Sequence, residues 1–324
     1  MDVRGSRRRV LVLPTPDLVV SRTEAVIDGL GAPLEMRELL GYPLAKARHQ
    51  LQRDPLWPVL HLPLRLGIAF GLSPDVAADL ASACLLLYGF ADLTDDAQDG
   101  DLRGDWGWER AVNAGFTLSF LGQERILGLD LPASTTRLLA EGFAQAGRKM
   151  TFGQDGDLRA VYPAIPSIAA YMETITGKTG ASVAFFSAAP AIAANQPQAS
   201  IQALHLYGES LGSYHQILSD LADYQAPSGR GTDARNRKLT LPLLYGFSQE
   251  RDGHLRAWLE GNHSDLDVAE TLASLGAPGY CRMKAQLFKR KALSALAALA
   301  LPAELDADLQ RLLKDPHAEL RLEL

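Results

Sequence analysis

Apolar residues recur at intervals of three and four positions along this chain from about residue 30 onward. This spacing puts them on one face of an α-helix, and the alternation of apolar and polar residues that is typical of half-buried strands is nearly absent. The pattern predicts helices throughout, most clearly over residues 76–97, 111–127, 135–150, 168–194, 200–224 and 280–300. No linker long enough to divide domains separates them, so we expect one all-α domain of long antiparallel helices around a central cavity.

The composition suits a large buried core and disfavours several classes of partner. Of the 324 residues, 47% are hydrophobic, which is ample for such a core. The net charge is −6 and the one basic block is residues 7–9, so a nucleic acid is not expected as a partner. Cys84 and Cys281 lie in apolar helical context, which predicts buried free thiols in a reducing, cytoplasmic compartment.

The N-terminal segment RRRVLVLPTP resembles a secretion signal, but Pro14 interrupts its apolar run after a few residues. We therefore expect residues 1–30 to be a loose leader and residues 31–324 to form the helical domain. Charge, glycine or proline also breaks each later apolar segment before it reaches about eighteen residues, so no transmembrane segment is expected.

Four acids follow the apolar run ASACLLLYGFA: Asp92, Asp95, Asp96 and Asp99. Helical side chains three or four residues apart are neighbours, so these charges repel one another. Gly100 suggests that the helix ends here, where the partial negative charge of the helix terminus adds to the repulsion. We therefore expect a cation to bind this acidic stripe, Asp92 to Asp99. Oxygen ligands without nearby histidine or cysteine favour Mg²⁺.

The alternative is a solvated acidic turn, which is the commoner explanation for an isolated Asp-rich pentad. A calcium-binding EF-hand loop is excluded, because with Gly100 as its glycine the ligand positions fall on Ala97 and Trp106. A metal site therefore needs a second, independent feature.

The helix ESLGSYHQILSDLADYQ supplies that feature, because it too ends in acids, Asp220 and Asp223. Two acidic helix ends that face each other across a bundle would hold divalent ions and, between them, a diphosphate. Basic residues should complete such a site, and the candidates are Arg103, Lys178 and Lys238.

Two other kinds of site are disfavoured. The Gly-Lys-Thr at 177–179 lacks the spacing of a nucleotide-binding P-loop, since Met172 stands where a glycine is needed and a helix precedes it. The seven histidines include no pair at zinc-ligand spacing.

Five motifs in this order resemble those of the trans-prenyl diphosphate synthase (polyprenyl synthetase) family, over about residues 76–312. DDAQD at 95–99 looks like its first Asp-rich motif, Gly153-Gln154 like its GQ motif, and YMETITGKTGAS like its KT helix. HQILSDLAD looks like the second Asp-rich motif, and Asp233 with KLTLP continues the pattern. The resemblance implies the isoprenoid (terpenoid) synthase helical bundle, an allylic prenyl diphosphate substrate, three Mg²⁺ ions bound with its diphosphate, and a homodimer.

The same resemblance assigns roles to particular residues. The implied metal ligands are Asp95, Asp96, Asp99, Ser219, Asp220 and Asp223. The implied diphosphate-binding residues are Arg103, Lys178 and Lys238. Gln154, Lys178 and Thr179 would act beside the carbocation, and Phe90 would limit the depth of the pocket and favour a short prenyl chain.

The chain departs from the family where isopentenyl diphosphate, the usual second substrate, binds. In QRDPLWP at 52–58, Asp54 and Trp57 stand where the family motif GGKRxRP has lysine and arginine. Tyr88 replaces a histidine, and Arg103 alone remains of two arginines. For Asp54 taken alone, misalignment is the alternative. An acid in place of lysine reverses the charge beside a diphosphate, so this site looks degraded.

The second Asp-rich motif also differs, because Ser219 takes its first position and a hydroxyl is a weaker Mg²⁺ ligand than a carboxylate. Terpene cyclases of the same superfamily use a serine in the corresponding motif. His215, where the family usually has phenylalanine, is either a cavity residue or a packed helix histidine.

The resemblance therefore implies a Mg²⁺-dependent prenyltransferase that ionises a short allylic prenyl diphosphate and transfers the prenyl group, with a degraded isopentenyl diphosphate site. Two alternatives stay open. One is a class I terpene synthase that cyclises a single prenyl diphosphate, and the other is an inactive regulatory subunit of a prenyl synthase.

Overall fold

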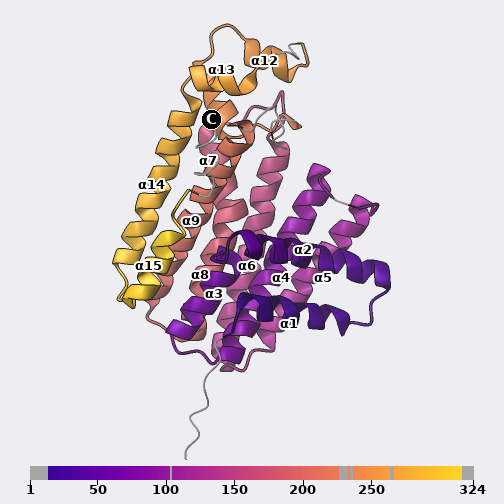
Figure 1. Cartoon of the computed structure of the whole chain (residues 1–324), viewed down its shortest axis with the longest axis vertical. Helices are drawn as coiled ribbons and strands as arrows, with labels where there is room; N and C mark the ends of the chain where they lie inside the picture. The colour runs from indigo at the N-terminus through magenta and orange to yellow at the C-terminus, as the bar shows by residue number, and fades with distance from the viewer. Residues whose placement is uncertain (1–13, 103, 226–232, 234–235, 263–265, 316–324) are drawn as a thin grey trace, which may run out of the picture.

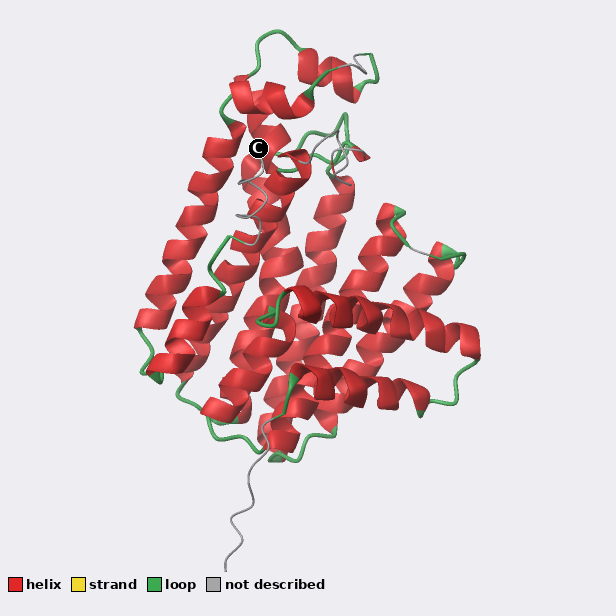
Figure 2. Ribbon diagram, viewed as in Figure 1, coloured by secondary structure: helices red, strands yellow, loops and turns green. Residues whose placement is uncertain are grey.

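The computed structural model describes residues 14–102, 104–225, 233, 236–262 and 266–315. Every regular element among these residues is a helix, and Figure 2 shows no strand in the described part of the chain. The predicted all-α class is therefore confirmed.

Six long helices form the body of the molecule and run roughly side by side in Figure 1. They are α4 (Pro74–Asp99), α5 (Trp108–Leu127), α6 (Ala133–Arg159), α8 (Ala181–Ala193), α9 (Gln198–Gln225) and α14 (Ala277–Ala297). Helix α9 packs against both α8 and α14, and α4 packs against α5. The apolar faces predicted from the sequence meet in this body.

Three helices precede the body: α1 (Pro16–Asp28), α2 (Leu34–Arg53) and α3 (Pro58–Ala69). In Figure 1, α1 and α2 lie across the long helices. The prediction of a loose leader over residues 1–30 is wrong for α1, while residues 1–13 lie outside the described part. The Thr15 side chain caps α1, and Val19, Val20 and Ile27 are buried against the rest of the protein, so burial fixes this segment.

Shorter helices follow α9: α11 (Leu241–Gln249), α12 (His254–Leu259), α13 (Val268–Ser274) and α15 (Ala303–Arg311). Figure 1 shows α12 and α13 at one end of α14, with α15 alongside it. Helix α11 packs against α14 and against α7 (Ile168–Ile175), which lies beside the candidate site described below.

Helix α4 is the one described helix long and apolar enough to cross a membrane, with a mean hydropathy of 1.6 over its best 18-residue window. The sequence expectation concerned an unbroken apolar run, and in α4 Asp79 and Asp92 interrupt the run before it reaches eighteen residues. Within the protein, 72% of that window is buried, as expected of a helix at the centre of a folded core. Its length and composition are thus explained by packing.

Two predicted helices differ in extent. Helix α6 continues nine residues beyond the predicted end at 150, because Gly153 and Gly156 do not break it but give room to neighbouring backbone and side-chain atoms. The predicted helix over 168–194 is divided by a π-helical turn, η1 (Thr176–Gly180), between α7 and α8. Both differences fall beside the candidate active site.

Candidate active site

The acidic stripe occupies the last two turns of α4. As predicted, the helix ends at Asp99, and Gly100 follows in the left-handed conformation with φ of 75°. The four aspartates separate into two pairs spaced four residues apart, Asp95 with Asp99 and Asp92 with Asp96, and each pair meets different cations. Lysines of the protein itself therefore offset part of the expected repulsion between these carboxylates.

Asp95 and Asp99 face Asp157 of α6 across two lysines. The Lys178 ammonium lies 2.8 Å from Asp95 Oδ1 and 2.9 Å from Asp157 Oδ2. Lys238 forms an ion pair with Asp99 and lies 3.4 Å from Asp157 Oδ2. Carboxylate oxygens of the three acids lie within 4.8 Å of one another, close enough to share a metal ion.

Charge and burial act against each other in this cluster. Burial disfavours the charged form of Lys178, but Asp95 and Asp157 outweigh it and raise the pKa of the ammonium to about 12. Burial also opposes ionisation of Asp157, yet the two lysines lower its pKa. For Asp99, burial and the nearby Asp95 prevail and raise its pKa. Three carboxylates against two ammonium groups leave net negative charge, which suits a divalent cation.

Close backbone contact between α6 and η1 fixes the position of Lys178. A β-carbon on Gly153 would lie 2.1 Å from the Lys178 backbone nitrogen, and one on Gly177 would lie 3.2 Å from Gly153 Cα. Only glycines allow this approach, and the π-helical turn brings the Lys178 side chain to Asp95 and Asp157. The GQ and KT motifs therefore form one packing unit.

The acids at the end of α9 are arranged differently from those of α4. Asp220 is buried, its Oδ2 accepts a hydrogen bond of 2.5 Å from the Tyr171 hydroxyl, and its Oδ1 accepts one of 2.7 Å from Gln216. The Thr179 hydroxyl in turn donates to Gln216 Oε1 at 2.6 Å. Burial raises the pKa of Asp220. Both oxygens of Asp220 are thus engaged by protein donors.

The remaining described residues of the predicted site have contacts other than the ion pairs of the three-carboxylate cluster. Asp223 accepts a hydrogen bond from the backbone N–H of Asp233, and Ser219 is exposed on α9. Asp96 accepts hydrogen bonds of 2.7 Å from both the Tyr42 hydroxyl and the Lys46 ammonium, both on α2, and no described contact joins it to Lys178 or Lys238. Arg103 lies outside the described residues. His215 bonds the Leu312 carbonyl, as a packed histidine does.

A cavity of about 540 Å³ opens beside the cluster. Asp95, Lys178 and Thr179 line its polar part, and the apolar part is lined by Phe90, Val112, Phe116 and Met150. Gln154 also lines it, and its amide donates a 2.9 Å hydrogen bond to Gln98 Oε1 across the space between α6 and α4. An anionic head group beside the lysines could therefore place an apolar tail inside the protein.

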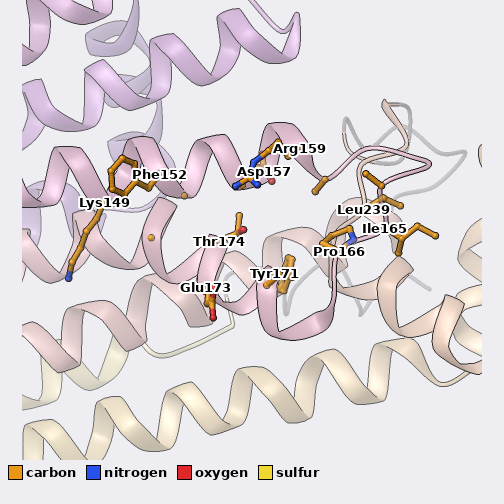
Figure 3. Close-up of a pocket in the computed structure, with 16 residues that line it drawn as sticks. Lys149, Phe152, Asp157, Arg159, Ile165, Pro166, Tyr171, Glu173, Thr174 and Leu239 are labelled. Atoms are coloured by element: carbon orange, nitrogen blue, oxygen red, sulfur yellow. The ribbon is translucent and has the colours of Figure 1, made fainter.

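A second cavity, of about 700 Å³, lies between α6, α7 and the segment that joins them. Figure 3 shows Asp157 and Phe152 on one side of it and Tyr171 and Thr174 on the other. Asp157 lines this cavity while Lys178 lines the smaller one, so their ion pair lies between the two.

Sequence reasoning missed Asp157, Lys46 and Tyr42. For Asp157 a signal existed, because it follows Gln154 by three residues and so falls on a neighbouring position of the same helix. Lys46 and Tyr42 carry no such signal, since their role depends on how α2 crosses α4.

Comparison with known proteins agrees with this architecture. The sequence model of polyprenyl synthetases matches residues 74–275. A geranylfarnesyl diphosphate synthase from Natronomonas pharaonis is 26% identical over 228 residues, which cover 64% of this chain and 66% of that protein. Component 2 of a heptaprenyl diphosphate synthase from Geobacillus stearothermophilus is 26% identical over 195 residues, covering 57% and 58%. These alignments span less than two thirds of either relative.

Among solved structures, a polyprenyl synthase from Caulobacter crescentus, complexed with calcium and isoprenyl diphosphate, superposes with a TM-score of 0.75. It is 25% identical, and the superposition covers 93% of this chain and 94% of that one. The family match spans more than half of the sequence and includes both acidic helix ends, Lys178 and Lys238. The chain therefore belongs to the polyprenyl synthetase family.

Proposed function

We propose that this protein is a Mg²⁺-dependent prenyltransferase that ionises a short allylic prenyl diphosphate and transfers the prenyl group to an acceptor other than isopentenyl diphosphate. The observation that carries the proposal is the cluster of Asp95, Asp99 and Asp157 with two lysines, placed at a partly apolar cavity. The curated relatives described above are named as prenyl diphosphate synthases or components of one.

The donor set fits magnesium, because the three acids offer only oxygen ligands and their carboxylates already converge. When bound, Mg²⁺ neutralises charge on the departing diphosphate. We propose Asp95 and Asp99 as ligands, with Asp157 as a further candidate, and place Asp223 and Ser219 on the opposite side of the diphosphate. We leave out Asp96, whose partners are Lys46 and Tyr42. Three ions, a homodimer and a cytoplasmic location remain part of the proposal.

The lysines have a second role once substrate binds. Lys178 and Lys238 pair with acids in the structure, and both ammonium groups would bind diphosphate oxygens if those carboxylates served as metal ligands. Preorganised cations that meet the leaving-group charge lower the barrier to C–O cleavage. Gln154, Thr179 and Gln216 line the same cavity and offer oxygen dipoles to the allylic cation.

The positions expected to bind the diphosphate of isopentenyl diphosphate, Asp54 and Trp57, carry no positive charge. Asp54, where lysine was expected, accepts a hydrogen bond of 3.0 Å from the Leu56 backbone. Trp57 is only 8% exposed and packs edge-on against Tyr88, with ring centroids 4.9 Å apart. Lys46 lies nearby, but its ammonium is engaged by Asp92 and Asp96. An acid and a buried aromatic pair are poor partners for isopentenyl diphosphate.

Cyclisation of a single prenyl diphosphate is the second candidate. It is favoured by Asp54 and Trp57 at the positions expected to bind isopentenyl diphosphate, and by Ser219 in the second Asp-rich motif. An inactive regulatory subunit is less consistent with the structure, because the ion pairs of Lys178 and Lys238 preserve the arrangement that ionisation requires.

The test is to incubate the protein and Mg²⁺ with dimethylallyl, geranyl, farnesyl and geranylgeranyl diphosphates, each with and without isopentenyl diphosphate. Diphosphate release and extracted products are both measured. We expect release that does not require isopentenyl diphosphate, and its loss in Asp95→Ala. Longer diphosphates formed only with isopentenyl diphosphate would contradict the proposed acceptor, hydrocarbons from one substrate would favour cyclisation, and no release at all would favour the regulatory subunit.

A further inference from the structure

Asp92 is a buried acid on the wall of the 540 Å³ cavity, and neither the metal nor the diphosphate sites use it. Its side chain is 12% exposed. The Oδ1 atom accepts a hydrogen bond of 2.8 Å from the Tyr88 hydroxyl and lies 2.8 Å from the Lys46 ammonium. The Oδ2 atom is buried and has no hydrogen-bond partner among the described groups.

A carboxylate oxygen without a donor is costly in such a place, because burial removes its water and nothing replaces the lost hydrogen bonds. Packing alone would be served as well by an apolar side chain on this helix, where Leu93 and Phe90 are neighbours. Lys46 and Tyr88 both bind Oδ1, so they orient the carboxyl group and leave Oδ2 without a hydrogen bond from either residue. This is the arrangement of a group held for proton transfer.

The position along α4 fits that use. Asp92 precedes Asp95 by three residues, so it lies about 4.5 Å further along the helix axis, away from the diphosphate cluster and toward the apolar part of the cavity. Asp95, Asp92 and Phe90 all line this cavity. A prenyl diphosphate whose head group is held at Asp95 and Lys178 would bring the carbons near its reactive end past Asp92.

We propose that Asp92 is the base that removes a proton from the carbocation in this cavity and so completes the reaction. This inference rests on the proposed function. The C–O bond of the allylic diphosphate breaks and its electron pair leaves with the diphosphate. The π-electrons of an alkene, in the same prenyl chain or in an acceptor, form the new C–C bond and leave a tertiary cation. A C–H bond beside that cation passes its proton to Asp92, and its electron pair becomes the new double bond.

Two observations support Asp92 over the other acids as this base. Asp95 and Asp99 are the proposed metal ligands and pair with lysines of the diphosphate cluster, and both oxygens of Asp220 accept hydrogen bonds. Burial also raises the pKa of Asp92 above that of an ordinary carboxyl group, in spite of Lys46 and Tyr88, and a higher pKa makes a stronger base.

The experiment compares the wild-type protein with Asp92→Asn and Asp92→Leu, using geranyl and farnesyl diphosphates with Mg²⁺. Diphosphate release and the ratio of alkene to alcohol products are measured. Without the base, water competes for the cation, so we expect the alkene-to-alcohol ratio to fall by about 10²-fold while diphosphate release continues. Asp92→Leu has a similar shape and serves if Asp92→Asn does not fold. Asp75→Asn, at the exposed start of the same helix, is the control and should keep the wild-type ratio.

An unchanged product ratio in folded Asp92 variants overturns this inference and leaves the proposed function standing. If folded Asp92 variants lose both diphosphate release and alkene formation, the inference is also overturned, because Asp92 then supports ionisation rather than proton removal. Absence of release from the wild-type protein with every diphosphate overturns the proposed function itself, and the inference falls with it.

Discussion

Asp157 is the acid that joins both lysines of the cluster, and its charge has a predictable dependence on pH. Lys178 and Lys238 lower its pKa in the folded protein despite its burial. The unfolded chain should titrate near the ordinary aspartate value of about 3.9. A carboxyl group with a lowered folded pKa stabilises the protein above the unfolded pKa, and this contribution disappears as the pH falls through the folded pKa.

We therefore expect Asp157→Asn to lower the free energy of unfolding by about 1–3 kcal/mol near pH 7, with the difference from wild type shrinking below about pH 4. Urea denaturation in metal-free buffer between pH 3 and 7 measures it. Glu141→Gln is the control, since this acid on the same helix is 60% exposed and forms an exposed ion pair with Arg137. A difference that grows on acidification would contradict the assigned ion pairs.

Asp220 and Asp99 should respond differently to metal. Asp220 accepts hydrogen bonds from Tyr171 and Gln216. Asp220→Asn should therefore destabilise the fold by about 1–3 kcal/mol and slow diphosphate release. It should leave the Mg²⁺ concentration for half-maximal release unchanged, whereas Asp99→Asn should raise that concentration. Measuring diphosphate release by both variants over a range of Mg²⁺ concentrations tests this difference. A higher Mg²⁺ requirement in Asp220→Asn would show that Asp220 binds metal.

Sequence reasoning found the residues that lie in motifs and missed those that depend on helix crossing. Asp95, Asp99, Lys178 and Lys238 meet in space as expected from two acidic helix ends with basic partners. Helical spacing could not show that α4's acids divide between two sets of cations, because Lys46 reaches Asp92 and Asp96 only through the tertiary packing of α2 on α4.

The contact between α6 and η1 is where one added methyl group should have the greatest effect. Gly153→Ala would bring a β-carbon to 2.1 Å from the backbone of Lys178, which cannot rotate away as a side chain could. We expect at least about 1–3 kcal/mol of destabilisation and loss of diphosphate release, because η1 must move and Lys178 moves with it.

The matched control is Gly147→Ala on the same helix, where the nearest neighbour of a new β-carbon is Leu87 Cδ1 at 3.8 Å. Replacing a helical glycine there should stabilise by about 0.5–1 kcal/mol. Thermal unfolding and diphosphate release are measured for both variants. Equal behaviour of the two would mean that the close approach at Gly153 is not what positions Lys178.

Helix periodicity predicted the long elements within a few residues at most ends, because buried faces repeat every three or four positions in α4, α5 and α9. Periodicity does not register a π-helical turn, since TGKTG has the composition of either a helix or a loop. Helix α6 also runs beyond the predicted end at 150, where Gly153 and Gly156 mark close packing rather than a terminus.

For the molecule as a whole, patterning predicted the class of architecture but not which segments complete it. The apolar body of α4 is buried because α1, α3, α5 and α8 all pack against it. The sequence predicts a loose leader at the N-terminus because Pro14 interrupts the apolar run there. Its buried residues become recognisable only when α4 is in place to receive them, since Thr23 hydrogen-bonds Ser82 at 2.8 Å across the two helices.

Deletion of residues 1–30 should therefore destabilise the whole molecule rather than trim a dispensable end. Val19, Val20 and Ile27 are 0–3% exposed, and fully burying such a side chain contributes about 1.5–3 kcal/mol. Their loss is large beside a total unfolding free energy of about 5–15 kcal/mol, and it uncovers apolar surface on α4. We expect a lower unfolding temperature and aggregation, whereas Leu18→Ala, at a position 41% exposed on the same helix, should change stability by less than about 0.5 kcal/mol. Calorimetry and light scattering make the comparison, and a truncated protein as stable as the full chain would mean that α1 is not part of the core.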